Sequence, residues 1–253
     1  MNETILKNWH DDDLSYNRQF KLSFGECTPD GKMSWSEILK ATSDSAGEDF
    51  EKRNMSWAFL KENDIALIVS RISFLVKKMP AYGEEITVHT WESAPQGPLC
   101  TRNFKIYDTN TKEDLIIAQT LWTNFNISTK KIMPAKNFTF RPCPTIITDF
   151  EGIKPGKIKL PEEMETIAHH KILYSELDAN GHTNNSKYIN FAIDSLPEEF
   201  QKKQIKNLRL NYSKEAHLGE LLEIKAFFNE IEKKYTVQGI IEGISSFEAE
   251  LYY

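Results

Sequence analysis

The chain has 253 residues, of which 40% are hydrophobic and 27% charged, and its net charge is −6. These proportions are typical of soluble globular proteins, and the acidic balance argues against a protein that mainly binds nucleic acid. No stretch approaches the roughly 20 apolar residues that span a bilayer, and the opening residues lack the pattern of a signal peptide, so we expect a cytoplasmic protein without membrane insertion.

Most of the chain is predicted to form β-strands. Runs rich in Phe, Ile, Val, Tyr and Thr recur with partial alternation of apolar and polar residues, and turn residues separate them. The predicted strands cover residues 16–24, 65–76, 86–92, 101–107 and 115–126 in the first half, and 166–174, 205–212, 221–228, 234–241 and 247–253 in the second.

Two segments have the spacing of helices. The first covers residues 34–53 and begins at Ser34, which can cap a helix. The second covers residues 184–195, and Pro197 follows it, where a helix breaks or restarts. Each half of the chain therefore has one strand, one helix and then four strands.

Faint internal similarity supports a repeat of this unit. The sequence Asp30-Gly31-Lys32 precedes the first helix as Asn180-Gly181-His182 precedes the second. We expect an α+β protein with an N-terminal domain (residues 1–128), a proline-containing linker (129–163) and a C-terminal domain (164–253). Each domain is predicted to be an antiparallel sheet wrapped around a long central helix, with the two sheets joined edge to edge.

The densest polar cluster covers residues 177–188, between a predicted strand and the second helix. Asp178, Asn180 and His182 alternate there, so in an extended chain their side chains would point the same way. The following helix start offers free N–H groups and a partial positive charge. A carboxylate, an amide, an imidazole and backbone donors suit acyl transfer to water, although turn and capping residues have a similar composition.

The cluster reads Asp178-x-Asn180-x-His182-x-Asn184-Asn185-x-x-Tyr188. This motif resembles that of acyl-acyl carrier protein (acyl-ACP) thioesterases, the plant plastid enzymes and their bacterial relatives. The segment Met79-Pro80-Ala81-Tyr82-Gly83 in the first half is similar to the same family. The resemblance implies two tandem hot-dog domains, with catalysis in the C-terminal domain and the acyl-chain pocket mostly in the N-terminal domain.

The family's catalytic positions carry over onto Asp178, Asn180, His182 and Glu215, whereas Ala216 stands where the plant enzymes have cysteine. We therefore expect water to attack the thioester directly, with Glu215 as general base. His182 and Asn180 would orient the thioester and stabilise the oxyanion, and Asp178 would hold one of them in place. Because Lys32 stands at the position of His182 in the first copy, we expect one active site per chain.

The resemblance also implies the partner, an acyl carrier protein carrying a fatty acyl chain, and basic linker residues such as Lys157 and Lys159 are a hypothetical docking face. No cofactor or metal is expected, because His169-His170 has no carboxylate at ligand spacing and the three cysteines are far apart. Two other functions stay open, an acyl-CoA thioesterase and a non-catalytic module that binds acyl chains. A homodimer is compatible with the sequence, although two fused hot-dog domains already supply the pairing.

Overall fold

The computed structural model describes residues 4–253. Over this range twelve strands form one antiparallel sheet in the order β1-β2-β4-β5-β6-β3-β9-β12-β11-β10-β8, with β7 beside β6. The strands of the first half are β1 (Thr4–His10), β2 (Tyr16–Lys21), β3 (Ile65–Val76), β4 (Glu85–Gln96), β5 (Leu99–Asp108), β6 (Asp114–Asn126) and β7 (Lys131–Met133). Those of the second half are β8 (Glu165–Lys171), β9 (Asn207–Tyr212), β10 (Leu221–Asn229), β11 (Lys234–Ile241) and β12 (Ile244–Tyr252).

The predicted strands are all present, but two of them were predicted too long. The chain leaves the sheet after Lys21 and after Lys171, and a short 3-10 turn follows at Phe24–Glu26 and at Tyr174–Glu176. In each turn a glutamate explains the departure, because Glu26 accepts a hydrogen bond from the Ser23 N–H (2.6 Å) and Glu176 accepts one from the Leu173 N–H (2.8 Å). These backbone donors are therefore lost to the strand.

Helix α1 (Trp35–Lys52) begins as predicted, with the Ser34 hydroxyl accepting from the Glu37 N–H (3.4 Å). The second predicted helix is wrong in its first turn. Residues Asn185–Lys187 form a 3-10 turn, because the Asn184 side chain binds the Ser186 N–H (2.9 Å), and α3 covers only Tyr188–Asp194. Two short helices were not predicted, α2 (Trp57–Glu62) and α4 (Glu198–Gln201). None of the helices between residues 4 and 253 has the length and apolarity to cross a membrane.

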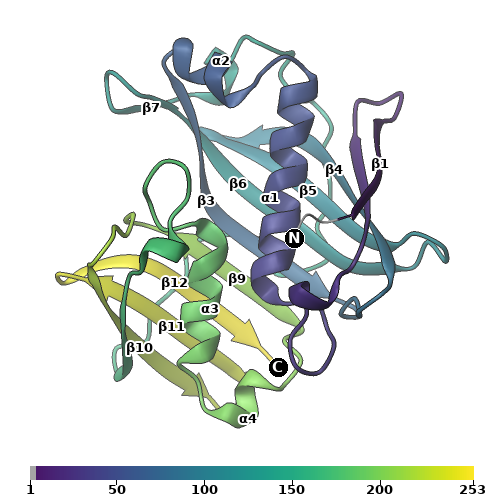
Figure 1. Cartoon of the computed structure of the whole chain (residues 1–253). Helices are drawn as coiled ribbons and strands as arrows, with labels where there is room; N and C mark the ends of the chain where they lie inside the picture. Colours follow the sequence, from purple (N-terminus) through teal and green to yellow (C-terminus); the bar gives the residue numbers. More distant parts are fainter. Residues whose placement is uncertain (1–3) are drawn as a thin grey trace.

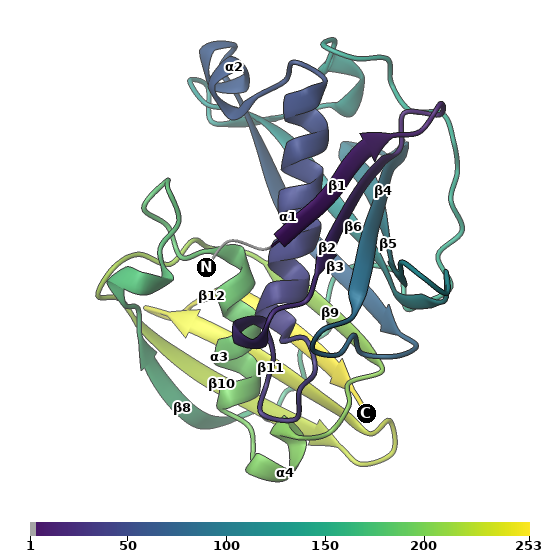
Figure 2. The same cartoon turned by 45° about the vertical axis from the view of Figure 1, so that its right-hand side comes forward.

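The two halves share one sheet because β3 pairs with β9, from Arg71 opposite Asn211 to Leu75 opposite Asn207. Helices α1 and α3 lie side by side on one face of this sheet (Figure 1). Phe74 of β3 and Leu208 of β9 are fully buried in the core beneath them. Strands β1 and β8 lie at the two ends of the sheet, and Figure 2 shows β1 running beside β2 at one edge. The core is therefore continuous across the junction of the halves.

The segment between the halves is held against the sheet by specific contacts. Trp91 Nε1 donates to the Thr148 hydroxyl (2.9 Å), the Ser73 hydroxyl donates to the Ile153 carbonyl, and Arg209 donates to the Gly156 carbonyl (2.9 Å). Ser73 and Arg209 neighbour the core residues Phe74 and Leu208, so they point to the opposite face. Residues 146–158 therefore cover the sheet face away from the helices, where Lys157 and Lys159 are exposed.

A glycine in β11 is required by the packing of the second half. A Cβ atom added at Gly239 would lie 2.2 Å from the ring of Phe247, which is fully buried. We expect Gly239→Ala to lower the free energy of unfolding by about 1–3 kcal/mol, because the ring or the strand must move. Urea unfolding measures the change, with Gly25→Ala as the control, since a Cβ at Gly25 meets nothing within 4 Å. Equal stability of both variants would contradict this reading of the packing.

Candidate active site

The sequence motif forms a tight turn, so the common direction that an extended chain would give the three side chains does not apply. One oxygen of Asp178 accepts hydrogen bonds from the backbone N–H groups of Asn180 (2.8 Å) and His182 (3.2 Å). The Asp178 N–H donates to the His182 carbonyl (2.8 Å), and Gly181 adopts a φ of +79° that suits glycine. The aspartate captures the backbone of the turn, so the three side chains do not line up along a strand. Asn180 is exposed at its tip.

The structure brings His182 and Glu215 together, although they are 33 positions apart in the sequence. His182 Nδ1 lies 3.3 Å from Glu215 Oε1, and their side chains are 35% and 58% exposed. Thr183 anchors the two segments, because both its N–H and its hydroxyl donate to the Ala216 carbonyl (2.9 Å each). The His217 ring meets the His182 ring edge-on, with centroids 5.1 Å apart. A solvent-accessible imidazole–carboxylate pair therefore stands beside the start of the second-half helix.

Two tyrosines form hydrogen bonds to the backbone of residues close to this pair. The Tyr188 hydroxyl accepts a hydrogen bond from the Ala216 N–H (3.1 Å), and the Tyr212 hydroxyl donates to the Asn185 carbonyl (2.9 Å). Tyr188 is buried, and burial raises the pKa of its hydroxyl. The sequence placed Tyr188 in the motif, but its contact with Ala216 depends on the fold.

At the helix start, one backbone N–H group has no acceptor in the described part of the chain. Most N–H groups from 182 to 187 are occupied: those of His182 and Ser186 by side chains, and those of Thr183, Asn184 and Lys187 by carbonyl oxygens. Within the described part of the chain, the Asn185 N–H has no acceptor. The sequence did not identify this particular N–H group, because the turn geometry decides which of the other N–H groups are already hydrogen-bonded.

The first half contains the same framework without the reactive pair. The Met33 N–H donates to the Pro80 carbonyl (2.8 Å), as the Thr183 N–H does to Ala216, and Lys32 pairs with Ala81 as His182 pairs with His217. In this alignment Lys32 replaces His182 and Met79 replaces Glu215. The first-half turn therefore has no counterpart of the His182–Glu215 pair.

His170 has a carboxylate partner that the sequence spacing did not indicate. Its Nε2 lies 2.9 Å from Glu176, and its ring stacks on Phe191 with centroids 4.3 Å apart. Across residues 4–253, no three His, Cys, Asp or Glu side chains gather in a way that could hold a metal ion.

Comparison with known families then places the chain. The model of the acyl-ACP thioesterase N-terminal domain matches residues 13–137, and that of the C-terminal domain matches residues 160–246. The chain belongs to the acyl-ACP thioesterase family. The family resemblance found in the motifs is thereby confirmed, and the matched C-terminal segment includes all four predicted site residues.

Curated relatives of the family match about two thirds of this chain at low identity. A chloroplastic acyl-[acyl-carrier-protein] hydrolase of Cuphea viscosissima is 28% identical over 169 residues, which cover 64% of this chain and 41% of that protein. The palmitoyl-acyl carrier protein thioesterase of Arabidopsis thaliana is 24% identical, covering 68% and 41% respectively. The match thus spans less than half the length of these relatives.

Solved structures of the family have the same fold. An acyl-ACP thioesterase from Bacteroides thetaiotaomicron superposes with a TM-score of 0.84 at 21% identity, covering 95% of this chain and 98% of that one. The 12:0-ACP thioesterase from Umbellularia californica superposes with a TM-score of 0.79 at 18% identity, covering 96% and 98%. At these identities the similarity establishes the architecture.

Proposed function

We propose that this chain hydrolyses fatty acyl-ACP thioesters to a free fatty acid and the carrier protein. The observation that carries the proposal is the 3.3 Å approach of His182 Nδ1 to Glu215 Oε1 beside a helix start with a spare N–H group. Membership of the family and the names of its relatives support the carrier-protein substrate. The two tandem hot-dog domains (residues 1–128 and 164–253) and a cytosolic location belong to the proposal as predictions from the sequence, which is also compatible with a further homodimer.

In the proposed reaction Glu215 accepts a proton from a water molecule, and the oxygen of that water attacks the thioester carbonyl carbon. The carbonyl oxygen becomes an oxyanion, which the Asn185 N–H and the Asn180 side chain stabilise by hydrogen bonds. The carbon–sulfur bond then breaks, and the thiolate of the carrier's prosthetic arm takes up the proton that Glu215 holds. His182 orients Glu215 and the thioester, while Asp178 shapes the turn through its bonds to the backbone.

A covalent cysteine route is not part of the proposal. Ala216 has no nucleophilic atom, and its backbone N–H and carbonyl are bound by Tyr188 and Thr183. The cysteines at positions 27, 100 and 143 belong to other segments of the chain. Direct attack by water is the reaction that the groups around His182 can support.

The test is hydrolysis by the wild-type protein of one acyl chain presented on the carrier protein and on coenzyme A. We expect kcat/KM for the carrier-protein thioester to be at least about tenfold higher, a difference of about 1.4 kcal/mol in transition-state binding. A panel of chain lengths on the carrier protein identifies the preferred acyl group. Equal or better use of coenzyme A thioesters would assign an acyl-CoA thioesterase. Tight acyl binding without turnover on either carrier would assign a binding module.

A further inference from the structure

The backbone on both sides of Glu215 is held by buried hydroxyl groups. The Ser246 hydroxyl donates to the Lys214 carbonyl (2.7 Å), which belongs to the peptide group before Glu215. The Tyr188 hydroxyl accepts from the Ala216 N–H (3.1 Å), which belongs to the peptide group after it. Ser246 is fully buried and Tyr188 is 3% exposed. Two core side chains, one from β12 and one from α3, therefore bind the peptide groups that flank the proposed general base.

A third hydroxyl belongs to the same cluster. The Thr183 hydroxyl donates to the Ala216 carbonyl (2.9 Å), and Thr183 is also buried. Burial raises the pKa of the Tyr188 hydroxyl, and hydrogen bonds with the side chains of Ser246 and Thr183 oppose the rise. The three hydroxyls therefore form one buried cluster, and a buried network whose hydrogen bonds are satisfied makes the backbone that it binds more rigid.

The carboxylate of Glu215 has little packing of its own to hold it. Its side chain is 58% exposed, and its 3.3 Å contact with His182 Nδ1 is at the long end of hydrogen-bond distances. A general base has to lie within hydrogen-bond reach of the proton that it accepts. The direction of this exposed side chain therefore depends on how firmly its backbone is placed.

The first half repeats this backbone frame without the hydroxyl groups. The Leu115 carbonyl accepts from the N–H groups of residues 77–78 (2.9 and 3.1 Å), as the Ser246 carbonyl accepts from those of residues 213–214 (2.8 and 3.2 Å). Leu115 thus occupies the place of Ser246, and the alignment of Lys32 with His182 gives the other correspondences. The second-half residues and their first-half counterparts are Ser246 and Leu115, Tyr188 and Ile38, and Thr183 and Met33.

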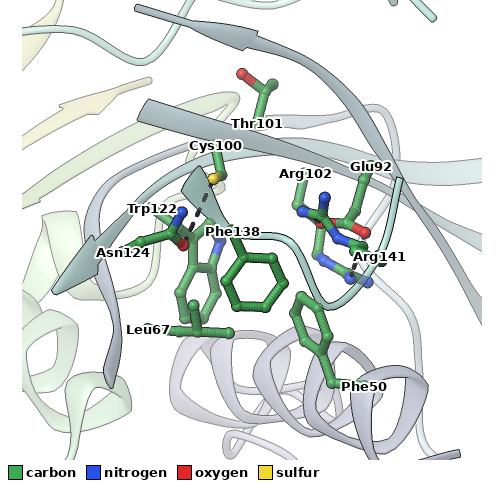
Figure 3. Close-up of a pocket in the computed structure, with 10 residues that line it drawn as sticks. All are labelled: Phe50, Leu67, Glu92, Cys100, Thr101, Arg102, Trp122, Asn124, Phe138 and Arg141. Carbon is green, nitrogen blue, oxygen red and sulfur yellow. Dashed lines mark hydrogen bonds and ion pairs between the residues drawn. The ribbon is translucent and has the colours of Figure 1, made fainter. Parts of the chain in front are cut away.

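In the first half the hydroxyls are missing together with the general base. Met79 stands at the position of Glu215, and Pro80, which has no N–H group, stands at that of Ala216. The first half does bury polar side chains elsewhere, in the ion-pair network around Arg102 near the end of α1 (Figure 3). The hydroxyls are therefore absent where the base is absent, and not because the first half lacks buried polar groups.

We propose that Tyr188 and Ser246, together with Thr183, are positioning residues whose hydroxyl groups hold the backbone of Glu215 so that its carboxylate faces the attacking water. This inference rests on the proposed function, in which Glu215 is the general base. Loss of the Tyr188 or Ser246 hydroxyl leaves a buried backbone group without its partner, and the segment can then shift. A catalytic group that is displaced by about an ångström loses much of its effect on rate.

The test is a double-mutant cycle on the hydrolysis of an acyl-ACP thioester. Tyr188→Phe and Ser246→Ala are each made in the wild-type protein and in Glu215→Gln. In the wild-type background we expect each substitution to lower kcat by about tenfold with little change in KM. In the Glu215→Gln background each should lower kcat by less than about twofold, because the base that the hydroxyls position is already absent.

Tyr16→Phe is the control for a purely structural effect. Tyr16 is fully buried, and its hydroxyl donates to Glu48 (2.6 Å) in the first half. Tyr16→Phe and Tyr188→Phe should both lower the urea midpoint of unfolding, because each removes a buried hydrogen bond. Tyr16→Phe should nevertheless leave kcat unchanged. Ser246→Ala removes a single oxygen atom, so it tests the inference even if the Tyr188 variant does not fold.

Wild-type kcat in both variants, or the same fold loss of kcat in both backgrounds, would overturn the inference and leave the hydrolase proposal intact. Wild-type kcat in Glu215→Gln would remove the general base from the proposed reaction, and this inference with it. Absence of turnover by the wild-type protein would overturn the hydrolase proposal itself.

Discussion

Glu215→Gln is expected to lower kcat for thioester hydrolysis by about 10²–10⁴-fold with little change in KM. Glutamine keeps the size of the side chain and can still approach His182, but its amide does not accept a proton from water at neutral pH. The glutamate is 58% exposed and touches His182 at 3.3 Å, so the substitution removes no buried contact. Single-turnover release of fatty acid from an acyl-ACP thioester measures the chemical step directly.

His182→Ala provides the companion measurement, and Glu242→Gln serves as control. His182→Ala should also lower kcat, because the thioester and Glu215 both lose their orienting partner. Glu242 is 84% exposed in the second half and lies 4.0 Å from Lys214, so its neutralisation removes the same charge away from the turn. Wild-type kcat in the Glu215 variant together with a low kcat in the His182 variant would assign the general base to another group.

The largest effect on stability is expected for Asp49→Asn. Asp49 is 2% exposed on α1 and accepts hydrogen bonds from Arg102 (2.7 Å), Arg53 (2.6 Å) and His10 (2.9 Å). The variant removes the carboxylate charge nearest to the buried Arg102 guanidinium and leaves Glu92, at 3.9 Å, as its remaining counter-charge, so the free energy of unfolding should fall by about 3–5 kcal/mol. Urea unfolding at neutral pH measures this change. Asp149→Asn is the control, since its carboxylate is 96% exposed and forms a surface ion pair with Lys154.

The same residue predicts how stability depends on pH. Burial alone raises the pKa of Asp49, but Arg102, Arg53 and the His10 hydrogen bond outweigh it and hold the pKa below its usual value. A carboxylate with a lowered pKa in the folded state contributes stability at neutral pH and loses it as the pH falls through that folded-state value. The stability difference between wild type and Asp49→Asn should therefore narrow in acid. A difference that stays constant down to the onset of acid unfolding would contradict the assigned direction.

Local sequence patterns were sufficient to predict most of the fold. Alternation of apolar residues indicated the strands, and Ser34 indicated the start of α1, because these features act over a few residues. Strand β1 was missed, since it lies at the sheet edge, where β2 is its one partner among the described strands. The shortened α3 was missed because Asn184 competes with helix hydrogen bonds through a side-chain contact. Such competition is decided by geometry that residue types alone do not specify.

The candidate site was predictable in its residues and less so in its geometry. The motif around His182 is local, and family resemblance added Glu215. Their 3.3 Å contact depends on the sheet, which brings residues 33 positions apart together. The buried ion-pair network of Glu92, Arg102 and Arg141 gave no sequence signal, since these residues belong to two strands and a linker. Patterns of short range cannot indicate a network of that kind.

The pairing of β3 with β9 joins the two copies of the repeated unit within one chain, and this affects how the sequences of the two copies can diverge. In an assembly of identical chains, every substitution appears at both symmetry-related positions. Here the copies are covalently distinct, so a residue can be exchanged in one of them alone: His170 beside Glu176 occupies the place that the buried Phe20 occupies beside Glu26. Because the two copies can differ, the turn in the first copy does not have to keep reactive residues. The interior of the first copy is then free to change in sequence independently of the second copy.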